Sequence, residues 1–423
     1  MAPSEVLVFE EEFDAFDLDI WQHEITMGGN KNWEFQYYTN NRTNSYVENG
    51  VLNLNPTLTA GNIGNASVMG TYGTFMMDLS GSAPADLCTS NEAFGCSRSS
   101  NVLWKMMIPP VQSARIRTVD SLRFKYGRLE VRAKLPRGDW LHPYLALWPA
   151  TNAYGQWPAS GAIDLLDSRG NDASYPPGGN NAITSGVHFG TDWSNDQNWK
   201  FRKSQNLTDS DFSSSFHTFG LYWDEEQMYT YVDTDSNRVV EVTFETDTFD
   251  ADDFGNRQNP WAGGGKNAPF DQDFYFIAGV AVGGTNGYFP AGAGGKPWED
   301  LGSVHGAANL DFWAAVDDWY PSWTQPAMQI ESVKLWQEKG KSNVNSYRVK
   351  SQFAAVEDIP FVPSVAAAQH SSSFSMSALA LALVVGLFAA AFAARRRLAA
   401  RRRDAYGALA APPPGGLAPT SSA

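Results

Sequence analysis

Short runs in which apolar and polar residues alternate recur along most of this chain, and they constrain its fold more than any other feature. Residues 126–134 and 327–336 show the alternation clearly, and a strand of this kind has one face in water and one face buried. Few stretches before residue 370 have helical periodicity. Fifteen Trp, 16 Tyr and 37 Gly agree with strands joined by turns. A chain of 423 residues can bury one large core, so we expect an all-β sandwich.

Residues 157–171 form the stretch on which the function depends. It reads as a short buried strand that carries carboxylates and ends in a Gly-Asn turn. Ala162 and Asp164 share a face because residues two apart on a strand point the same way. Strict alternation would send Asp167 to the opposite face, but the adjacent Leu165 and Leu166 fit a β-bulge that turns the chain back. We therefore expect Asp164 and Asp167 to lie on the same face.

The charge of the chain is unevenly distributed. The net charge is −15, although the tail from Arg395 onward contains six Arg and one Asp. Without that excess of five positive charges, residues 1–394 carry a net charge of about −20. A body this acidic argues against nucleic acid or an anionic membrane as the ligand, and it is compatible with a neutral ligand.

Cysteines and glycosylation sequons both favour a secretory compartment. Cys88 and Cys96 are the only cysteines, and we expect a local disulfide in preference to two free thiols. N-glycosylation sequons begin at Asn41, Asn65 and Asn206. The first 13 residues have neither the basic nor the apolar region of a signal peptide, so we expect a leader that the gene model lacks.

The C-terminal part of the chain changes in composition. We expect a β-sandwich domain over residues 1–340 and a polar linker over residues 341–374. Residues 375–394 form a 20-residue run without a charge, long enough to cross a bilayer. The Arg clusters that follow predict that the tail over residues 395–423 is cytosolic, and its Pro- and Gly-rich end predicts that it is disordered. This predicts a single-pass protein of the plasma membrane or another secretory-pathway membrane, with the β-domain extracellular or lumenal.

Several long segments match one known family together. They are residues 7–10, 16–24, 110–115, 124–127, 132–140, 152–161 and 281–287. On these segments the chain resembles glycoside hydrolase family 16, and within it the β-1,3-glucan recognition (Gram-negative-bacteria-binding) proteins and laminarinases. The resemblance covers roughly residues 6–340. It implies a curved, concanavalin A-like β-jelly-roll that holds a β-glucan on its concave face. It implies no cofactor, and it leaves open whether the fold binds a structural calcium ion.

The resemblance also assigns roles to the carboxylate strand. Active members carry Glu-x-Asp-x-x-Glu, in which the first Glu is the nucleophile, the Asp tunes it and the last Glu is the acid/base. This chain has Ala162-x-Asp164-x-x-Asp167. Ala162 cannot act as a nucleophile, whereas a retaining mechanism needs two carboxyls about 5–5.5 Å apart. An inverting route with Asp167 as acid and Asp164 as base stays open, as does a purely structural bond from Asp164 to the turn at 169–171.

Aromatic and polar residues around this strand are candidates for contact with a sugar. Tryptophan rings can stack on sugars or pack in a core. His188, on the next strand, could contact sugar, donate a hydrogen bond to Asp164, or only make hydrogen bonds within the sheet. The Gly-rich loop after residue 282 could close over a cleft or be a plain turn. The candidates are Trp140, Trp148, Trp157, His188, Asn286 and Tyr288. We expect His217 to pack in a strand, and we expect no metal ligands among the site residues.

Three functions are compatible with these observations. The leading one is a membrane-anchored, non-catalytic β-1,3-glucan-binding protein of the cell surface. The second is a weakly active endo-β-glucanase or transglycosylase that uses Asp164 and Asp167. The third is a structural surface domain that binds other proteins.

Overall fold

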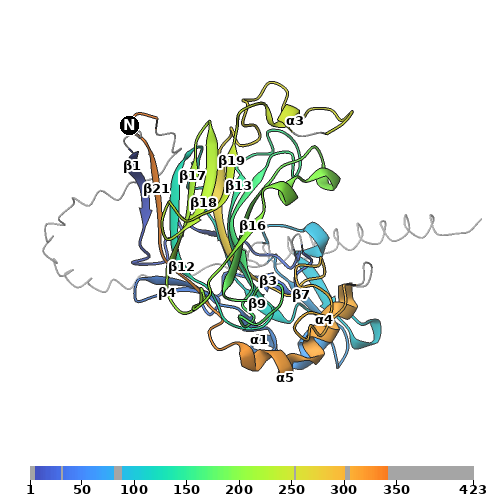
Figure 1. Cartoon of the computed structure of the whole chain (residues 1–423). Coiled ribbons are helices and arrows are strands. Elements are labelled where there is room, and N and C mark those ends of the chain that lie inside the picture. Colours follow the sequence, from blue (N-terminus) through green and yellow to red (C-terminus); the bar gives the residue numbers. More distant parts are fainter. Residues whose placement is uncertain (1–4, 30–31, 81–87, 252–253, 301–304, 342–423) are drawn as a thin grey trace, which may run out of the picture. The chain divides into compact units, whose positions relative to one another are not determined.

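The structure, a computed structural model, describes residues 5–29, 32–80, 88–251, 254–300 and 305–341. The chain divides into two units, Met1–Gln352 and Phe353–Ala423, and every described residue lies in the first. In that unit two eight-stranded sheets contain most of the strands (Figure 1). We call them the outer sheet and the cleft sheet, because the second carries the candidate site.

The outer sheet is built around two long antiparallel strands, β12 (Gly127–Lys134) and β21 (Met328–Glu338). Both alternate as the sequence predicts. In β12, for example, Leu129 and Val131 are buried, whereas Arg132 is exposed to solvent. The other strands are β19 (Arg238–Thr243), β18 (Gln227–Val232) and β17 (His217–Trp223) beyond β12, β5 (Val51–Leu54) and β4 (Ser45–Glu48) beyond β21, and β1 (Glu5–Glu11), which also pairs with β21.

The cleft sheet has β13 (Leu141–Pro149) and β20 (Phe274–Val282) at its centre, paired along their whole lengths. Every residue of β20 is buried, as expected for a strand at the centre of a sheet. From one edge the strands are β16 (Lys203–Asn206), β15 (Ala182–His188), β14 (Ala162–Ser168), β13, β20, β10 (Arg115–Arg117) and β2 (Gln22–His23), with β11 (Arg123–Phe124) also paired to β20.

Large aromatic side chains fill the space between the sheets. Trp223 of β17 packs edge-on against Phe124 and Phe274 of the cleft sheet, with ring centroids 6.3 and 5.4 Å away. Its indole Nε1 donates to the carbonyl oxygen of Phe270 at 3.2 Å, so the polar atom is satisfied. Burial of each such side chain contributes about 1.5–3 kcal/mol. The prediction of an all-β jelly-roll sandwich is confirmed.

Smaller elements surround the two sheets. A three-stranded sheet contains β3 (Gln36–Tyr38), β9 (Val111–Ser113) and β6 (Thr57–Leu58), and a two-stranded sheet contains β7 (Phe75–Asp78) and β8 (Ser97–Ser100). The α-helices are α1 (Ala60–Ile63), α2 (Asn65–Met69), α3 (Thr248–Ala251), α4 (His305–Ala314) and α5 (Val316–Trp319). The 3-10 turns are η2 (Glu92–Phe94), η3 (Val102–Trp104), η4 (Trp193–Asn195), η5 (Asn198–Lys200) and η6 (Tyr320–Ser322).

The predicted transmembrane helix requires a correction. The longest helix described, α4, has 10 residues, which span about 15 Å, or half of a bilayer core. In the described ranges no helix is long and apolar enough to cross a membrane. This finding contradicts the predicted membrane span. The predicted single-pass membrane localisation depended on that span and is wrong with it. Residues 375–394, to which the span was assigned, lie outside the described residues, as do the predicted linker and tail after residue 341, whose boundaries stay predictions.

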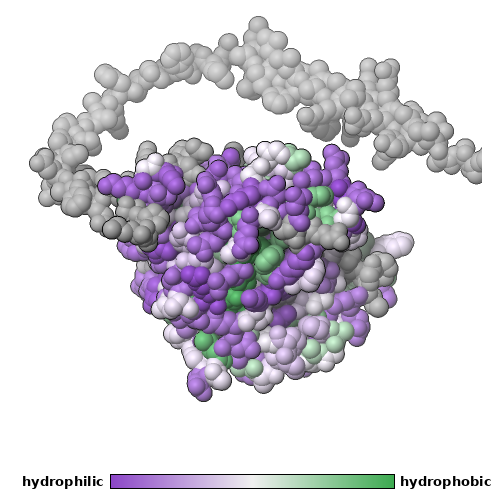
Figure 2. All heavy atoms as spheres, turned by 45° about the horizontal axis from the view of Figure 1, so that its top comes forward, coloured by the Kyte–Doolittle hydropathy of each residue, from purple (hydrophilic) through white to green (hydrophobic). Residues whose placement is uncertain are grey.

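The surface seen in Figure 2 is mostly hydrophilic, with hydrophobic residues gathered in a hollow near its middle. Large apolar side chains are nevertheless exposed at several places in the described chain. Tryptophans stand out among them, because Trp104, Trp193 and Trp199 are 75%, 79% and 72% exposed.

Candidate functional site

The two carboxylates of β14 lie on one face of the strand because of a β-bulge. Asp167 lies opposite Tyr144 of β13 whereas Asp164 lies opposite Ala146, so three steps along β14 face two steps along its partner. The same irregularity separates Asp164 from Asp167 on the β15 side. Asp164 and Asp167 consequently line one cavity of 140 Å³, and the predicted bulge is confirmed.

Asp167 is held by a histidine from the neighbouring strand. His142 of β13 is buried, and its Nε2 lies 2.7 Å from Oδ1 of Asp167. The imidazole stacks on Tyr288 with ring centroids 3.8 Å apart. The Tyr288 hydroxyl donates to the carbonyl oxygen of Ser168 at 2.8 Å, and the Arg169 guanidinium lies 4.2 Å from the phenol ring. The loop that contains Tyr288 therefore supports the Asp167 carboxylate through His142.

Asp164 is held by a second histidine, His188 at the end of β15. His188 Nε2 lies 2.9 Å from Oδ2 of Asp164, and its Nδ1 lies 2.6 Å from Oδ2 of Asp196. His188 is also the residue that pairs with Ala162 across the strands. The Trp157 ring lies 5.5 Å from the imidazole. His188 thus joins the carboxylate strand to the loop between β15 and β16.

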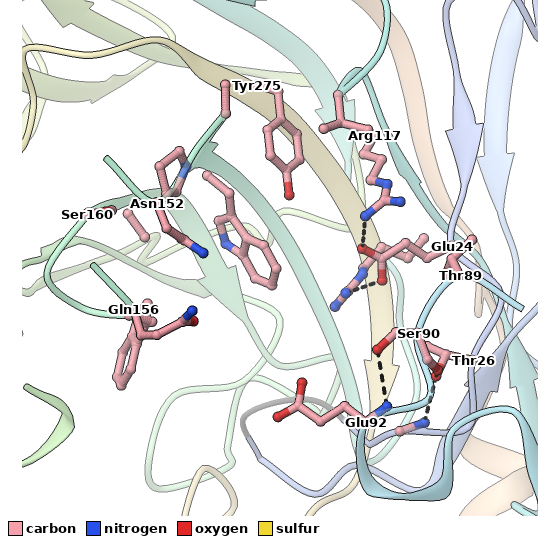
Figure 3. Close-up of a pocket in the computed structure, with 18 of the residues that line it drawn as sticks. Glu24, Thr26, Thr89, Ser90, Glu92, Arg117, Asn152, Gln156, Ser160 and Tyr275 are labelled. Carbon is pink, nitrogen blue, oxygen red and sulfur yellow. Dashed lines mark hydrogen bonds and ion pairs between the residues drawn. The ribbon is translucent and has the colours of Figure 1, made fainter. Parts of the chain in front are cut away.

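A larger cleft of 610 Å³ begins on the Ala162 side of the strand. One wall contains Asn152, Gln156 and Ser160, and the facing wall contains Thr89, Ser90 and Glu92 (Figure 3). Trp148 and Trp157 also line this cleft, and Trp157 is 38% exposed. The cleft therefore combines aromatic faces with amide and hydroxyl groups.

A buried ion-pair cluster lies at the boundary between the two cavities. Glu24 pairs with Arg115 and, at 3.0 Å, with Arg117 (Figure 3). The Arg115 guanidinium lies over the rings of Tyr38 and Trp148 at 5.1 and 5.2 Å. Burial disfavours its charge, but the Glu24 carboxylate together with the hydroxyls of Tyr144 and Tyr38 outweighs burial and holds the pKa of Arg115 well above its ordinary value. Arg115 is a fixed cation that lines both cavities.

The wall formed by residues 88–93 is closed by a disulfide. Cys88 and Cys96 are bonded, with Cα atoms 5.5 Å apart, so the predicted disulfide is confirmed. Thr89 holds the loop to the sheet, because its hydroxyl accepts from the Ile25 amide at 3.0 Å. The Thr26 hydroxyl donates to the carbonyl oxygen of Ser90 at 2.8 Å. The disulfide loop is therefore fixed at the edge of the cleft.

Several predicted residues lie away from the cavities. Trp140 is 2% exposed and packs against Trp298 with ring centroids 5.1 Å apart. Asn286 is exposed on its loop, and His217 lies on the outer sheet with its Nδ1 2.9 Å from Asp233 Oδ2. The sequon residues are Asn41 in a turn, Asn65, which accepts from the Trp313 indole at 3.0 Å, and Asn206, exposed on the edge strand β16. Glycosylation stays a prediction.

Several residues of the site are not among those predicted from the sequence. His142 and Tyr144 precede Ala146 and Trp148 at two-residue intervals on β13, and all four line the smaller cavity. That alternation was the available signal for His142. Arg115 and Arg117 alternate in the same way on β10, whereas the position of Glu24 beside them depends on the pairing of β2 with β10. Among the described residues no group of three or more His, Cys, Asp and Glu side chains could hold a metal ion.

A family model described as "Glycosyl hydrolases family 16" matches residues 86–268. A β-1,3-glucan-binding protein of Penaeus monodon is 44% identical over 345 residues, a match that covers 78% of this chain and 90% of that relative. The chain belongs to glycosyl hydrolase family 16.

Other relatives agree with the family. Gram-negative bacteria-binding protein 1 of Drosophila melanogaster is 31% identical over 345 residues, which are 78% of this chain but 64% of that relative. This family 16 chain therefore spans less than two thirds of the Drosophila protein. The laminarinase catalytic domain of Thermotoga maritima superimposes with a TM-score of 0.50 at 22% identity, covering 79% of this chain and 98% of that domain. That similarity shows the shared fold.

Proposed function

We propose that this protein binds β-1,3-glucan in the cleft and does not hydrolyse it. The observation that carries the proposal is the methyl group at position 162, where the family motif has its nucleophile. Ala162 is 1% exposed and lines the larger cleft. A retaining mechanism needs a second carboxyl about 5–5.5 Å from the acid/base to form the glycosyl-enzyme, and a methyl group cannot form that bond.

The carboxylates that remain on β14 support the same proposal. Oδ1 of Asp167 is engaged by His142 and Oδ2 of Asp164 by His188. Asp167 is also one methylene shorter than the Glu of the family motif, and a displacement of about 1 Å can cost about 100-fold in rate. We assign to both carboxylates the role of accepting hydrogen bonds from sugar hydroxyls.

The surroundings of the strand are suited to a sugar chain. Pyranose rings stack on aromatic faces, and we assign this contact to Trp148 and Trp157. The amides of Asn152 and Gln156 can both donate to and accept from sugar hydroxyls. Two further residues predicted from the sequence to contact sugar, His188 and Tyr288, line the smaller cavity. The ligand class is supported by the Penaeus relative, which is named as a β-1,3-glucan-binding protein.

A weakly active glycosidase or transglycosylase is the second candidate. The observation in its favour is that Asp164 and Asp167 line the same cavity. An inverting reaction would use Asp167 as the acid and Asp164 as the base toward a water, across a carboxyl separation of about 6.5–9.5 Å. This candidate requires measurable turnover that Asp167→Asn abolishes.

The test combines a binding assay and a hydrolysis assay on the same preparation. Immobilised laminarin should retain the protein while reducing ends in a laminarin solution stay at background. Trp148→Ala with Trp157→Ala should weaken retention, and Trp104→Ala, which replaces an exposed tryptophan of η3, is the matched control. Failure of the parent protein to bind any β-glucan would exclude the proposal, and turnover lost in Asp167→Asn would replace it with the second candidate.

A further inference from the structure

The loop between β15 and β16 exposes two tryptophans to solvent. Trp193 lies in η4 and Trp199 in η5, and their side chains are 79% and 72% exposed. Figure 1 shows the two short helical turns of this loop in green, to the right of the strand labels of the cleft sheet. Apolar residues scattered singly on a surface need no explanation. Two indoles exposed on one short loop are not a scattered single residue, and both rings are open to a ligand.

Hydrogen bonds hold the backbone of this loop. The Asp192 carboxylate caps η4, because Oδ1 accepts from the Ser194 amide at 3.0 Å and from Asn195 Nδ2 at 2.7 Å. Bonds from Ser194 and Asn195 lower the pKa of Asp192 to about 2, so the cap persists at neutral and mildly acidic pH. Asn198 Nδ2 donates to the carbonyl oxygen of Val187 at 3.2 Å. Because the loop is already held in place, stacking of a ligand on it would cost little conformational entropy of the loop.

The loop is joined directly to the candidate site. Asp196 lies between the two tryptophans in sequence, and its carboxylate is bonded to His188 at 2.6 Å. His188 is bonded to Asp164 and lies beside the Trp157 ring, which lines the larger cleft. The loop that carries the two exposed indoles is therefore attached to the end of the site that contains Ala162 and His188.

We propose that Trp193 and Trp199 form an outer subsite on which sugar units of a long β-linked glucan stack where the chain leaves the cleft. This proposal rests on the proposed glucan binding and adds a second, separate contact area to it. The ligand class follows from the chemistry, since the flat C–H faces of a neutral pyranose fit indole rings. The Lys200 ammonium lies 5.4 Å from the Trp199 ring.

An outer subsite makes affinity depend on chain length. A short oligosaccharide can occupy the cleft alone, whereas a long chain already bound there reaches the indoles at a high effective concentration. The parent protein should therefore bind laminarin at least about 10-fold more tightly than laminaritriose. Trp193→Ala with Trp199→Ala should remove about that factor for laminarin and leave the laminaritriose affinity unchanged.

Titration calorimetry of the full chain with laminaritriose and with laminarin tests this expectation. Trp104→Ala is the matched control, since it removes an indole of similar exposure from another loop. The outer subsite is refuted if the double variant binds laminarin as tightly as the parent, or if it loses affinity equally for both ligands. A double variant that keeps its laminarin affinity but loses self-association in ultracentrifugation would assign the indoles to a protein contact instead. A parent that binds neither ligand overturns the proposed function, and the outer subsite with it.

Discussion

In the proposed function, position 162 is the residue that separates glucan binding from glucan hydrolysis. Its Cβ lies on the strand that carries Asp164 and Asp167, and the neighbouring His188 is already engaged by carboxylates on both nitrogens. A carboxylate at this position would restore the second group that a retaining mechanism requires.

Restoring both glutamates should therefore create glucanase activity. We expect Ala162→Glu with Asp167→Glu to release reducing ends from laminarin at a rate on the order of 100-fold or more above that of Ala162→Gln with Asp167→Glu. The Gln variant is the matched control, because it has the same size and lacks the carboxylate. Equal, background rates for both variants, with laminarin binding retained, would show that more than the nucleophile has been lost.

His23 gives a pH dependence to stability. Burial, assisted by the charge of Arg42, lowers the pKa of His23 from 6.5 to about 4, and its Nε2 lies 2.7 Å from the Ser45 hydroxyl. The unfolded chain therefore takes up a proton at a higher pH than the folded chain does. The stability associated with neutral His23 is complete above pH 6.5 and decreases as the pH falls towards about 4, by on the order of 3 kcal/mol.

Urea unfolding between about pH 7 and about pH 4 measures this effect. His23→Gln retains a hydrogen-bonding group and cannot be protonated in this range, so its unfolding free energy should decrease less than that of the parent over the same interval. Parallel pH profiles for the two proteins would contradict the assignment to His23.

At the level of elements, the alternation of apolar and polar residues predicted the main strands and their buried faces. It identified β12 and β21. The turn between β4 and β5 is an Asn49-Gly50 pair in which both residues have positive φ, as a two-residue hairpin requires. The doubled leucine of β14 indicated the bulge. These features are local, because a strand's faces and a tight turn are determined by a few adjacent residues.

The remaining site residues depend on which strands become neighbours. The pair of His142 and Asp167 exists because β13 lies beside β14, and the wall at residues 88–93 reaches the cleft through bonds to residues 25 and 26. Trp140 illustrates the opposite error. It precedes β13 with a φ of +67°, so the alternation that places His142 in the cavity does not extend to it, and its ring turns into the core.

The disulfide loop is an element whose removal should affect binding. Cys88→Ala with Cys96→Ala opens a short loop, and loss of such a crosslink costs about 2–3 kcal/mol of unfolding free energy. Because Thr89, Ser90 and Glu92 line the cleft, we expect affinity for laminaritriose to fall several-fold as well. Calorimetric binding and thermal unfolding of parent and variant check both effects. A destabilised variant with unchanged affinity would show that this wall does not contact the ligand.

At the scale of the whole molecule, the sign of the charge restricts the ligand. The net charge of −15 repels polyanions, whereas it has no direct interaction with an uncharged glucan. The candidate cleft contains the cations Arg115 and Arg117, but Glu24 neutralises part of their charge and they are held in ion pairs. Recognition should therefore depend on stacking and hydrogen bonds, which salt screens little.

Salt dependence distinguishes this mode of recognition from an electrostatic one. Between about 20 mM and about 500 mM NaCl, where the screening length falls several-fold, the laminarin affinity should change by less than about 2-fold. A carboxymethylated β-1,3-glucan is the matched ligand, because it has the same backbone and carries negative charge. Its affinity should be lower at low salt and should rise with added salt, as repulsion by the acidic surface is screened. A laminarin affinity that fell steeply with salt would contradict recognition of a neutral chain.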